Sequence, residues 1–167
     1  TTHNFQSQSI NEAKLNKLNK KAHAFTANVE GDFPEFSYPT DFKLVLKVGA
    51  QVMFVKNDIS HDKLFYNGKI GVITAIEDDI IHVKCEGDYS IIPVEPTEWH
   101  NTKYTIDEQT KEIKENHVGV FTQYPLKLAW AITIHKSQGL TFEKAIIDAN
   151  AAFAHGQVYV ALSRCKT

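Results

Sequence analysis

Two short segments near the end of the chain hold the residue types that most readily contact phosphate groups. The first runs from Thr133 through Gly139 as Thr-Ile-His-Lys-Ser-Gln-Gly and presents hydroxyl, imidazole and ammonium donors at nearly consecutive positions. The second contains Arg164, the only arginine among 18 basic residues. Lysine and hydroxyl groups after an apolar strand can hold phosphates without reading a base. Arginine adds a rigid planar fork of donors that matches phosphate oxygens in pairs.

Each of these residues has a simpler explanation when it is taken alone. A histidine or a Lys-Ser pair beside a strand usually belongs to a solvated loop. A single arginine usually forms a surface ion pair that contributes little to stability. The order of the two segments, with an apolar stretch between them, favours the functional interpretation.

The stretches from Ala129 to Glu143 and from Gly156 to Arg164 resemble the fifth and sixth motifs of superfamily-one helicases. They are most similar to the PIF (petite integration frequency) family of 5'-to-3' DNA helicases, and RecD-like helicases are the next closest. The resemblance implies contacts to the backbone of single-stranded DNA, contacts to ATP, and a catalytic arginine finger at the γ-phosphate. The residues for these three roles are Thr133, His135, Lys136 and Ser137 for DNA, Gly139 and Glu143 for ATP, and Arg164 for the finger.

The N-terminal stretch resembles the fourth helicase motif more loosely. Thr2-His3-Asn4 matches its Thr-x-Asn element, and Asn11 lies on the helix that follows. The resemblance therefore adds Thr2 and Asn4 as candidate DNA contacts. A helix cap and an ordinary helix face explain the same residues equally well.

Two parts of a nucleotide hydrolase are absent from the sequence. A phosphate-binding P-loop needs a glycine directly before its lysine, but Ile134-His135 precede Lys136 and no complete loop surrounds Gly68-Lys69. Asp78-Asp79 reads as a hairpin turn rather than as a metal site. Phosphoryl transfer requires the phosphate cradle, the metal carboxylate and the finger together. We therefore expect the C-terminal part of a longer helicase, whose intact form uses ATP and Mg²⁺ and whose present part binds neither and hydrolyses no ATP alone.

Composition is ordinary for a soluble globular chain of 167 residues, with 43% apolar and 23% charged residues. No run approaches the eighteen or so apolar residues of a membrane helix, and no secretory signal is present. We expect an intracellular protein, in the cytoplasm or nucleoid if it is bacterial.

His82 and Cys85 make half a zinc site at best, so we expect no bound metal. The net charge of −2 is a weak test for DNA binding, because helicases grip DNA through a local groove.

The spacing of apolar residues predicts the elements that position these segments. Towards the two ends we expect a strand end at residues 1–5, helices at 10–18, 126–131 and 154–164, and strands at 23–29, near Thr133 and at 145–148. From Leu44 onward the pattern is β throughout, with strands within 46–58, 66–76, 80–85 and 89–94 and a polar hairpin at 104–114. Short strands with tight turns indicate a small barrel. The Lys-Val-Gly-Ala-Gln-Val-Met stretch also resembles the SH3-like insertion of PIF and RecD-like helicases.

We therefore predict an α/β fold. A RecA-like second motor domain (2A), with a partial parallel sheet and helices, comprises residues 1–43 and 122–167, and an SH3-like barrel (2B) is inserted as residues 44–121. The resemblance implies ATP-driven 5'-to-3' translocation on single-stranded DNA and unwinding of duplexes in replication, repair or recombination. The partners would be single-stranded DNA, DNA forks and the first motor domain of the same parent, with no membrane. Three alternatives are a RecD-like, exonuclease-associated helicase part, a single-strand-binding module without motor activity, and a partner-binding SH3-like domain.

Overall fold

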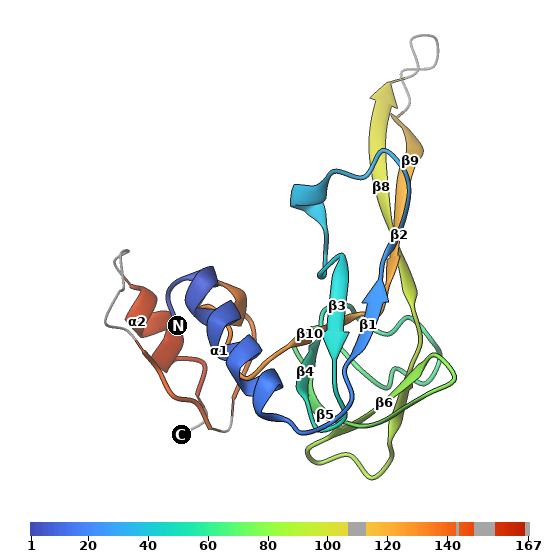
Figure 1. The fold of residues 1–167 in the computed structure, drawn as a ribbon. Coiled ribbons are helices and arrows are strands. Elements are labelled where there is room, and N and C mark those ends of the chain that lie inside the picture. The colour runs from blue at the N-terminus through green and yellow to red at the C-terminus, as the bar shows by residue number, and fades with distance from the viewer. Residues whose placement is uncertain (107–112, 143, 149–155, 166–167) are drawn as a thin grey trace.

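A computed structural model describes residues 1–106, 113–142, 144–148 and 156–165 of the chain (Figure 1). Helices lie near the two ends, and the middle of the chain is almost entirely β-structure. In chain order the elements are α1 (Asn4–Lys17), β1 (His23–Thr26), β2 (Asn28–Gly31), the 3₁₀ helix η1 (Glu35–Ser37), β3 (Lys43–Leu46), β4 (Gln51–Phe54), β5 (Ile70–Glu77), β6 (Ile80–Cys85), β7 (Ile92–Val94), β8 (Thr97–Ile106), β9 (Ile113–Gln123), β10 (Leu126–Leu128), the 3₁₀ helix η2 (His135–Ser137) and α2 (Gln157–Leu162).

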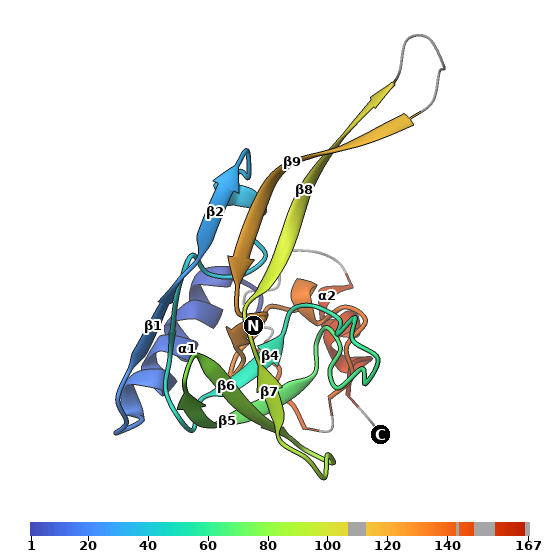
Figure 2. The same ribbon diagram turned by 90° about the vertical axis from the view of Figure 1, so that its right-hand side faces the viewer.

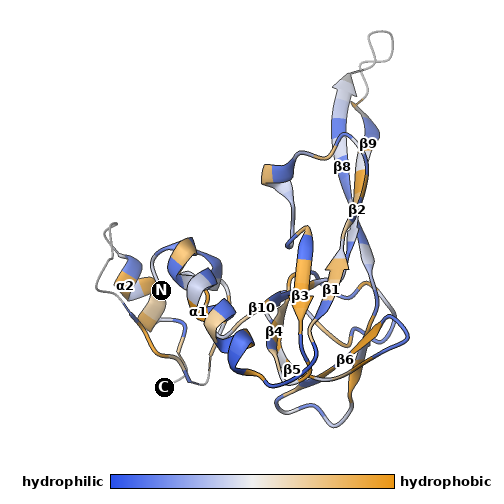
Figure 3. Cartoon of the chain, in the orientation of Figure 1, coloured by the Kyte–Doolittle hydropathy of each residue, from blue (hydrophilic) through white to orange (hydrophobic). Residues whose placement is uncertain are grey.

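The hydrophobic core lies on one face of an antiparallel five-stranded sheet with the order β10-β4-β5-β6-β7. Side chains alternate along β6, so that Ile81, Val83 and Cys85 are buried while their neighbours are partly exposed. This alternation is typical of a sheet with one covered face. Figure 3 shows the resulting apolar strands beside a largely hydrophilic α1. The core also takes Leu15 from α1, which attaches the helix to the sheet.

The turn between β5 and β6 confirms the hairpin predicted at Asp78-Asp79. Both aspartates have positive φ, at 47° and 62°. Two positive φ values in succession are what a two-residue type I′ turn requires, and aspartate tolerates them better than most residues. These carboxylates therefore serve a turn and do not form the metal site of a nucleotide hydrolase.

A long hairpin of β8 and β9 projects from the body of the molecule (Figures 1 and 2). At its base, β2 pairs with β9 to make a three-stranded sheet, and beyond Gly119 the two hairpin strands pair only with each other. Trp99 and Phe121 pack at the base with their ring centroids 5.9 Å apart, and the Lys56 ammonium lies 5.0 Å from the Trp99 ring. The polar hairpin predicted at 104–114 is confirmed, although its strands extend well beyond those bounds.

Two larger features of the predicted fold are corrected. The five-stranded sheet is open, with β10 and β7 at its edges, so no closed barrel forms in the described part of the chain. All ladders among the described residues are antiparallel, and parallel pairing is limited to one isolated bridge between Phe142 and Cys165. A parallel sheet needs several adjacent parallel strands, and the described terminal segments supply only this single bridge.

Several predicted elements near the ends are also wrong. Residues 1–5 do not end a strand, because α1 already begins at Asn4. The helix predicted at 126–131 is the strand β10, because Leu126 and Leu128 alternate with Lys127 and pair along β4. Thr133 lies in no strand, and residues 145–148 have no regular structure, with Ile146 99% exposed. The predicted helix at 154–164 is observed as α2 within the described residues. The strand predicted at 23–29 is split into β1 and β2.

None of the helices that the structure describes has both the length and the apolar character that a membrane span needs.

Candidate nucleotide and nucleic-acid interface

Helix α1 holds the stretch that leads into the motif from Thr133 to Gly139. The Asn11 side chain donates a hydrogen bond to the Ala131 carbonyl and accepts one from the Ala131 amide, both at 2.9 Å. The Ser7 hydroxyl donates to the same carbonyl at 2.7 Å. A buried asparagine that satisfies both backbone groups of one residue acts as a clamp between distant parts of the chain. This clamp fixes the position from which the motif starts.

The motif itself turns tightly after residue 133. Ile134 donates its amide hydrogen to the Thr1 carbonyl at 2.8 Å, and η2 follows directly. Thr133 and Ser137 are buried, at 4% and 6% exposure, and the Ser137 hydroxyl donates to the Ile134 carbonyl at 2.7 Å. Their direct contact with DNA stays a prediction, and in this arrangement Ser137 uses its hydroxyl to stabilise the turn.

The turn exposes the two basic motif residues. His135 and Lys136 both face solvent, and Lys136 has no ion-pair partner among the described residues. Lys127 on β10 lies close enough to Lys136 for their charges to repel, and burial followed by this repulsion lowers the pKa of Lys127. Asp41 opposes the shift more weakly. Two lysines whose charges repel make a place that a bound anion would stabilise.

Arg164 lies on the turn after α2 and beside the motif. Its carbonyl accepts a hydrogen bond from the Phe142 amide at 2.8 Å, next to the parallel bridge between Phe142 and Cys165. Its side chain is half-buried, and its guanidinium donates to the Ser163 hydroxyl at 3.1 and 3.3 Å. Within the described residues no carboxylate neutralises it. A guanidinium in this setting can bind an external anion such as a phosphate.

A small cavity of ≈ 60 Å³ brings the two segments together. Thr133 and Ser137 line it from the motif, and Phe142 and Arg164 line it as well. The arginine and the motif are thus packed against one shared space. A displacement of either segment would move the other, because close-packed interiors transmit displacements.

Gly139 ends the motif in a conformation that suits glycine. Its φ is +79°, and a Cβ atom added there would meet nothing within 4 Å. The position therefore needs glycine for its left-handed backbone, and it leaves open space for a ligand to approach. Glu143, the second predicted ATP contact, lies outside the described residues.

The two N-terminal candidates differ in their surroundings. The Thr2 hydroxyl is buried and lies 2.8 Å from Nδ1 of His3, whereas Asn4 is exposed at the start of α1. Asn4 is accessible to a strand that passes over the helix end, and Thr2 is held inside the protein. The DNA contacts of both residues stay predictions.

Sequence reasoning missed the clamp and Lys127. Asn11 was noted only for its place in a loosely matching motif, and no local pattern shows that its side chain reaches residue 131. Lys127 was hidden by the wrong helix at 126–131, although the Leu-Lys-Leu alternation would have placed it on the outer face of a strand.

The described residues include no group of three His, Cys, Asp or Glu side chains that could hold a metal ion. Cys85, the cysteine of the His82-x-x-Cys85 pair, is buried, and this burial raises the pKa of its thiol. A raised thiol pKa disfavours the thiolate form that binds metals.

Comparison with known proteins identifies close relatives. The chain is 34% identical to the ATP-dependent DNA helicase Pif1 of Campylobacter jejuni over 93% of its length and 37% of that protein. It is 34% identical to human ATP-dependent DNA helicase PIF1 over 99% of the chain and 25% of the relative. The chain therefore spans about a third or less of the curated relatives it matches. No protein-family model matches the sequence.

Solved structures give the same result. A Bacteroides Pif1 in complex with ADP-AlF4 aligns over 99% of this chain and 37% of the solved one, with a TM-score of 0.86 and 45% identity. A Bacteroides Pif1 bound to single-stranded DNA aligns over the same shares, with a TM-score of 0.81 and 45% identity.

Proposed function

The chain belongs to the Pif1 family of DNA helicases, and we propose that it forms the part of an ATP-dependent helicase that grips single-stranded DNA and supplies an arginine to the ATP site. In the intact protein this part would contribute to 5'-to-3' translocation and to unwinding of duplexes at forks. The first motor domain of the same protein would complete the ATP site.

The DNA-gripping role is supported by the exposed His135 and Lys136. Both lie on a turn that is fixed at one end by the α1 clamp and at the other by Gly139. Such a turn can hold a phosphate through donors while leaving the bases unread, which allows the strand to move on. Lys127 beside them strengthens the positive potential at this place.

The single observation that carries the proposal is the direct link between this turn and Arg164. The Phe142 amide donates to the Arg164 carbonyl at 2.8 Å, and both residues line the same small cavity as Thr133 and Ser137. A change at the γ-phosphate that pulls on the guanidinium would therefore act on the DNA-contacting turn. This linkage is what a motor needs in order to couple hydrolysis to movement.

The residues present fit ATP only in part, as expected for one side of a shared site. Arg164 has no carboxylate partner among the described residues, and Gly139 leaves open space above its Cα atom, so both suit a phosphate-facing role. ATP would supply the phosphoryl group whose transfer releases free energy. We propose that Mg²⁺ accompanies it on the other motor domain.

We further propose that the division into a RecA-like domain at 1–43 and 122–167 and an SH3-like domain at 44–121 applies to this chain. The TM-scores to Pif1 structures support it. Strand pairing crosses both boundaries, because β1 pairs with β3, β2 with β9, and β10 with β4. The two domains would therefore be joined by hydrogen-bonded sheet and not by a loose linker.

Two measurements test the proposal. In the intact helicase, Arg164→Ala should lower kcat for ATP by roughly a thousandfold, with little change in affinity for single-stranded DNA. Arg164→Lys serves as the matched control, because it keeps the charge and loses the planar fork. In the isolated chain, Lys136→Ala should weaken binding of single-stranded DNA and reduce its dependence on salt. ATP turnover by the isolated chain that Arg164→Ala abolishes would contradict the proposal.

A further inference from the structure

The five-stranded sheet has a second face, opposite the core, of which the proposed function uses only Lys127. Register places Gln51, Val72 and Lys84 in one row of this outer face and Lys127, Met53 and Ile70 in the next. Residues of one row belong to adjacent strands and point to the same side. The outer face thus carries apolar side chains in the middle and a lysine near each end.

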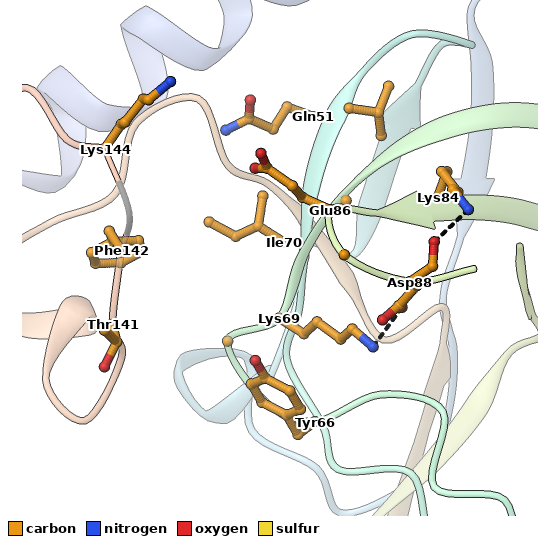
Figure 4. A pocket seen from close by; sticks show the side chains of 14 residues that line it. Gln51, Tyr66, Lys69, Ile70, Lys84, Glu86, Asp88, Thr141, Phe142 and Lys144 are labelled. Carbon is orange, nitrogen blue, oxygen red and sulfur yellow. Dashed lines mark hydrogen bonds and ion pairs between the residues drawn. The ribbon is translucent and has the colours of Figure 1, made fainter. Parts of the chain in front are cut away.

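An open cleft of ≈ 760 Å³ runs along this face (Figure 4). One wall is the sheet together with the Tyr66 and Asp88 loops, and the other is formed by Thr141, Phe142 and Lys144, which come shortly after the motif. Figure 4 shows Tyr66 and Ile70 on the sheet side, with Phe142 and Lys144 across the opening. The two walls approach each other at Gly68, where a Cβ atom would lie only 2.0 Å from the Leu140 side chain.

The described residues that line the cleft include three lysines and two acids, so they carry a small excess of positive charge. Lys69 and Asp88 neutralise each other in an ion pair of 2.7 Å. The Lys84 ammonium donates to the Asp88 carbonyl at 2.6 Å, and Lys144 is exposed with no ion-pair partner among the described residues. Among the described residues of the lining, Glu86 is the one acid besides Asp88. The described lining therefore holds the lysines Lys84 and Lys144 outside the Lys69–Asp88 ion pair, with Glu86 as the one carboxylate beside them.

The exposed aromatic ring of Tyr66 adds a surface on which a base can stack. Its side chain is 61% exposed and stands at the edge of the cleft, with the Lys69 ammonium 5.8 Å from the ring. Single-strand-binding surfaces combine lysines that follow the backbone with aromatic rings that stack bases. A proline-rich peptide would instead need several clustered aromatic rings, and the described lining contains two, Tyr66 and Phe142.

We propose that this cleft is a second contact site for the single strand, continuous with the first at Lys136. Lys84 and Lys144 would contact phosphates, and Tyr66 would stack one base. Lys127 would lie between the two sites, because register places it on the outer face in the row of Ile70, and its charge interacts with that of Lys136. The inference rests on the proposed function, since it extends the path of the same strand.

Binding of oligothymidylates to the 167-residue chain tests the inference, measured by fluorescence anisotropy at several salt concentrations. An oligomer of about 4 nucleotides can occupy one site, whereas one of about 12 nucleotides can reach both. Tyr66→Ala should weaken binding of the longer oligomer about fivefold or more, and Lys144→Ala should lower its salt slope by about 0.7. Neither variant should change binding of the shorter oligomer. Tyr89→Ala and Lys20→Ala are matched controls, because both residues are exposed and neither lines the cleft.

The outcomes separate the two proposals. If Lys136→Ala weakens binding of both oligomers while the cleft variants behave like the controls, the second site is refuted and the proposed function stands. The cleft would then belong to a peptide or to another part of the same protein. If the unaltered chain binds neither oligomer, the proposed DNA grip itself fails.

Discussion

Replacing Asn11 with alanine tests whether the α1 clamp positions the motif. The change removes two hydrogen bonds of 2.9 Å to Ala131 and a longer one of 3.4 Å to the Leu128 carbonyl. It leaves the helix itself intact, because alanine is the best helix former. Any loss of stability therefore reports on the contact between α1 and the distant segment.

The expected loss follows from the partners that remain. The Ala131 carbonyl keeps the Ser7 hydroxyl as a donor, but the Ala131 amide loses the side-chain oxygen that it contacts. Each lost hydrogen bond contributes about 1 kcal/mol net, and an unsatisfied backbone group in a partly buried place adds to that cost. Asn11→Ala should therefore reduce the free energy of unfolding by about 2 to 3 kcal/mol. For a domain of this size that corresponds to a fall in Tm of roughly 5 to 10 °C.

Urea unfolding at pH 7 measures this loss, with Ser7→Ala as the control. Ser7→Ala removes one donor from a carbonyl that Asn11 still serves, so its cost should be about 1 kcal/mol. Because both side chains converge on Ala131, the double variant should depart from additivity. A loss for Asn11→Ala no greater than that for Ser7→Ala would refute the clamp. Unchanged affinity for single-stranded DNA in a destabilised Asn11→Ala chain would show that the clamp does not position the motif.

Three further predictions concern other parts of the structure. Gly68→Ala should destabilise the chain more than Gly87→Ala, by about 1 to 3 kcal/mol in urea unfolding, because both have positive φ but only at Gly68 would the new Cβ atom collide with a side chain. Lys127→Met should raise the free energy of unfolding at pH 7. Because the pKa of Lys127 is lowered in the folded state, the native protein binds fewer protons than the unfolded chain, so stability should rise with pH towards the ordinary lysine value of 10.5, and the variant should lose this rise. Iodoacetamide should alkylate Cys165 well before Cys85 in the native protein, as read by mass spectrometry, since Cys85 is 2% exposed and burial raises the pKa of its thiol; equal rates would mean that the core around β6 opens readily.

Local sequence patterns predicted the structure correctly where neighbouring residues determine it. The alternation along β5 and β6 and the Asp78-Asp79 turn identify their hairpin, because turn type and side-chain period are set by neighbouring residues. The two motifs are neighbours in the sequence, and in the structure Thr133, Ser137 and Arg164 line one cavity.

Predictions from the sequence were wrong where contacts with residues distant in the chain determine the structure. Leu126 to Leu128 become a strand because the edge of β4 is available for pairing, which the local apolar spacing does not reveal. The run from Ala145 to Asp148 has the composition of a buried strand, but no neighbouring strand covers it in the described structure. Ser137 illustrates the same limit at a single residue, because its hydroxyl bonds to its own turn and the side-chain type alone predicts only that it can donate.

The clamp between α1 and Ala131 also constrains how the chain folds during synthesis. Asn11 and Ala131 are 120 positions apart, so α1 leaves the ribosome long before its docking partner exists. At about 5 to 20 residues per second, the helix waits on the order of 10 s. During that interval Leu15, which ends in the core, stays exposed unless the intervening sheet has already formed. The two ends of the chain, which carry the candidate DNA and ATP contacts, are therefore assembled last, after the β-structure between them.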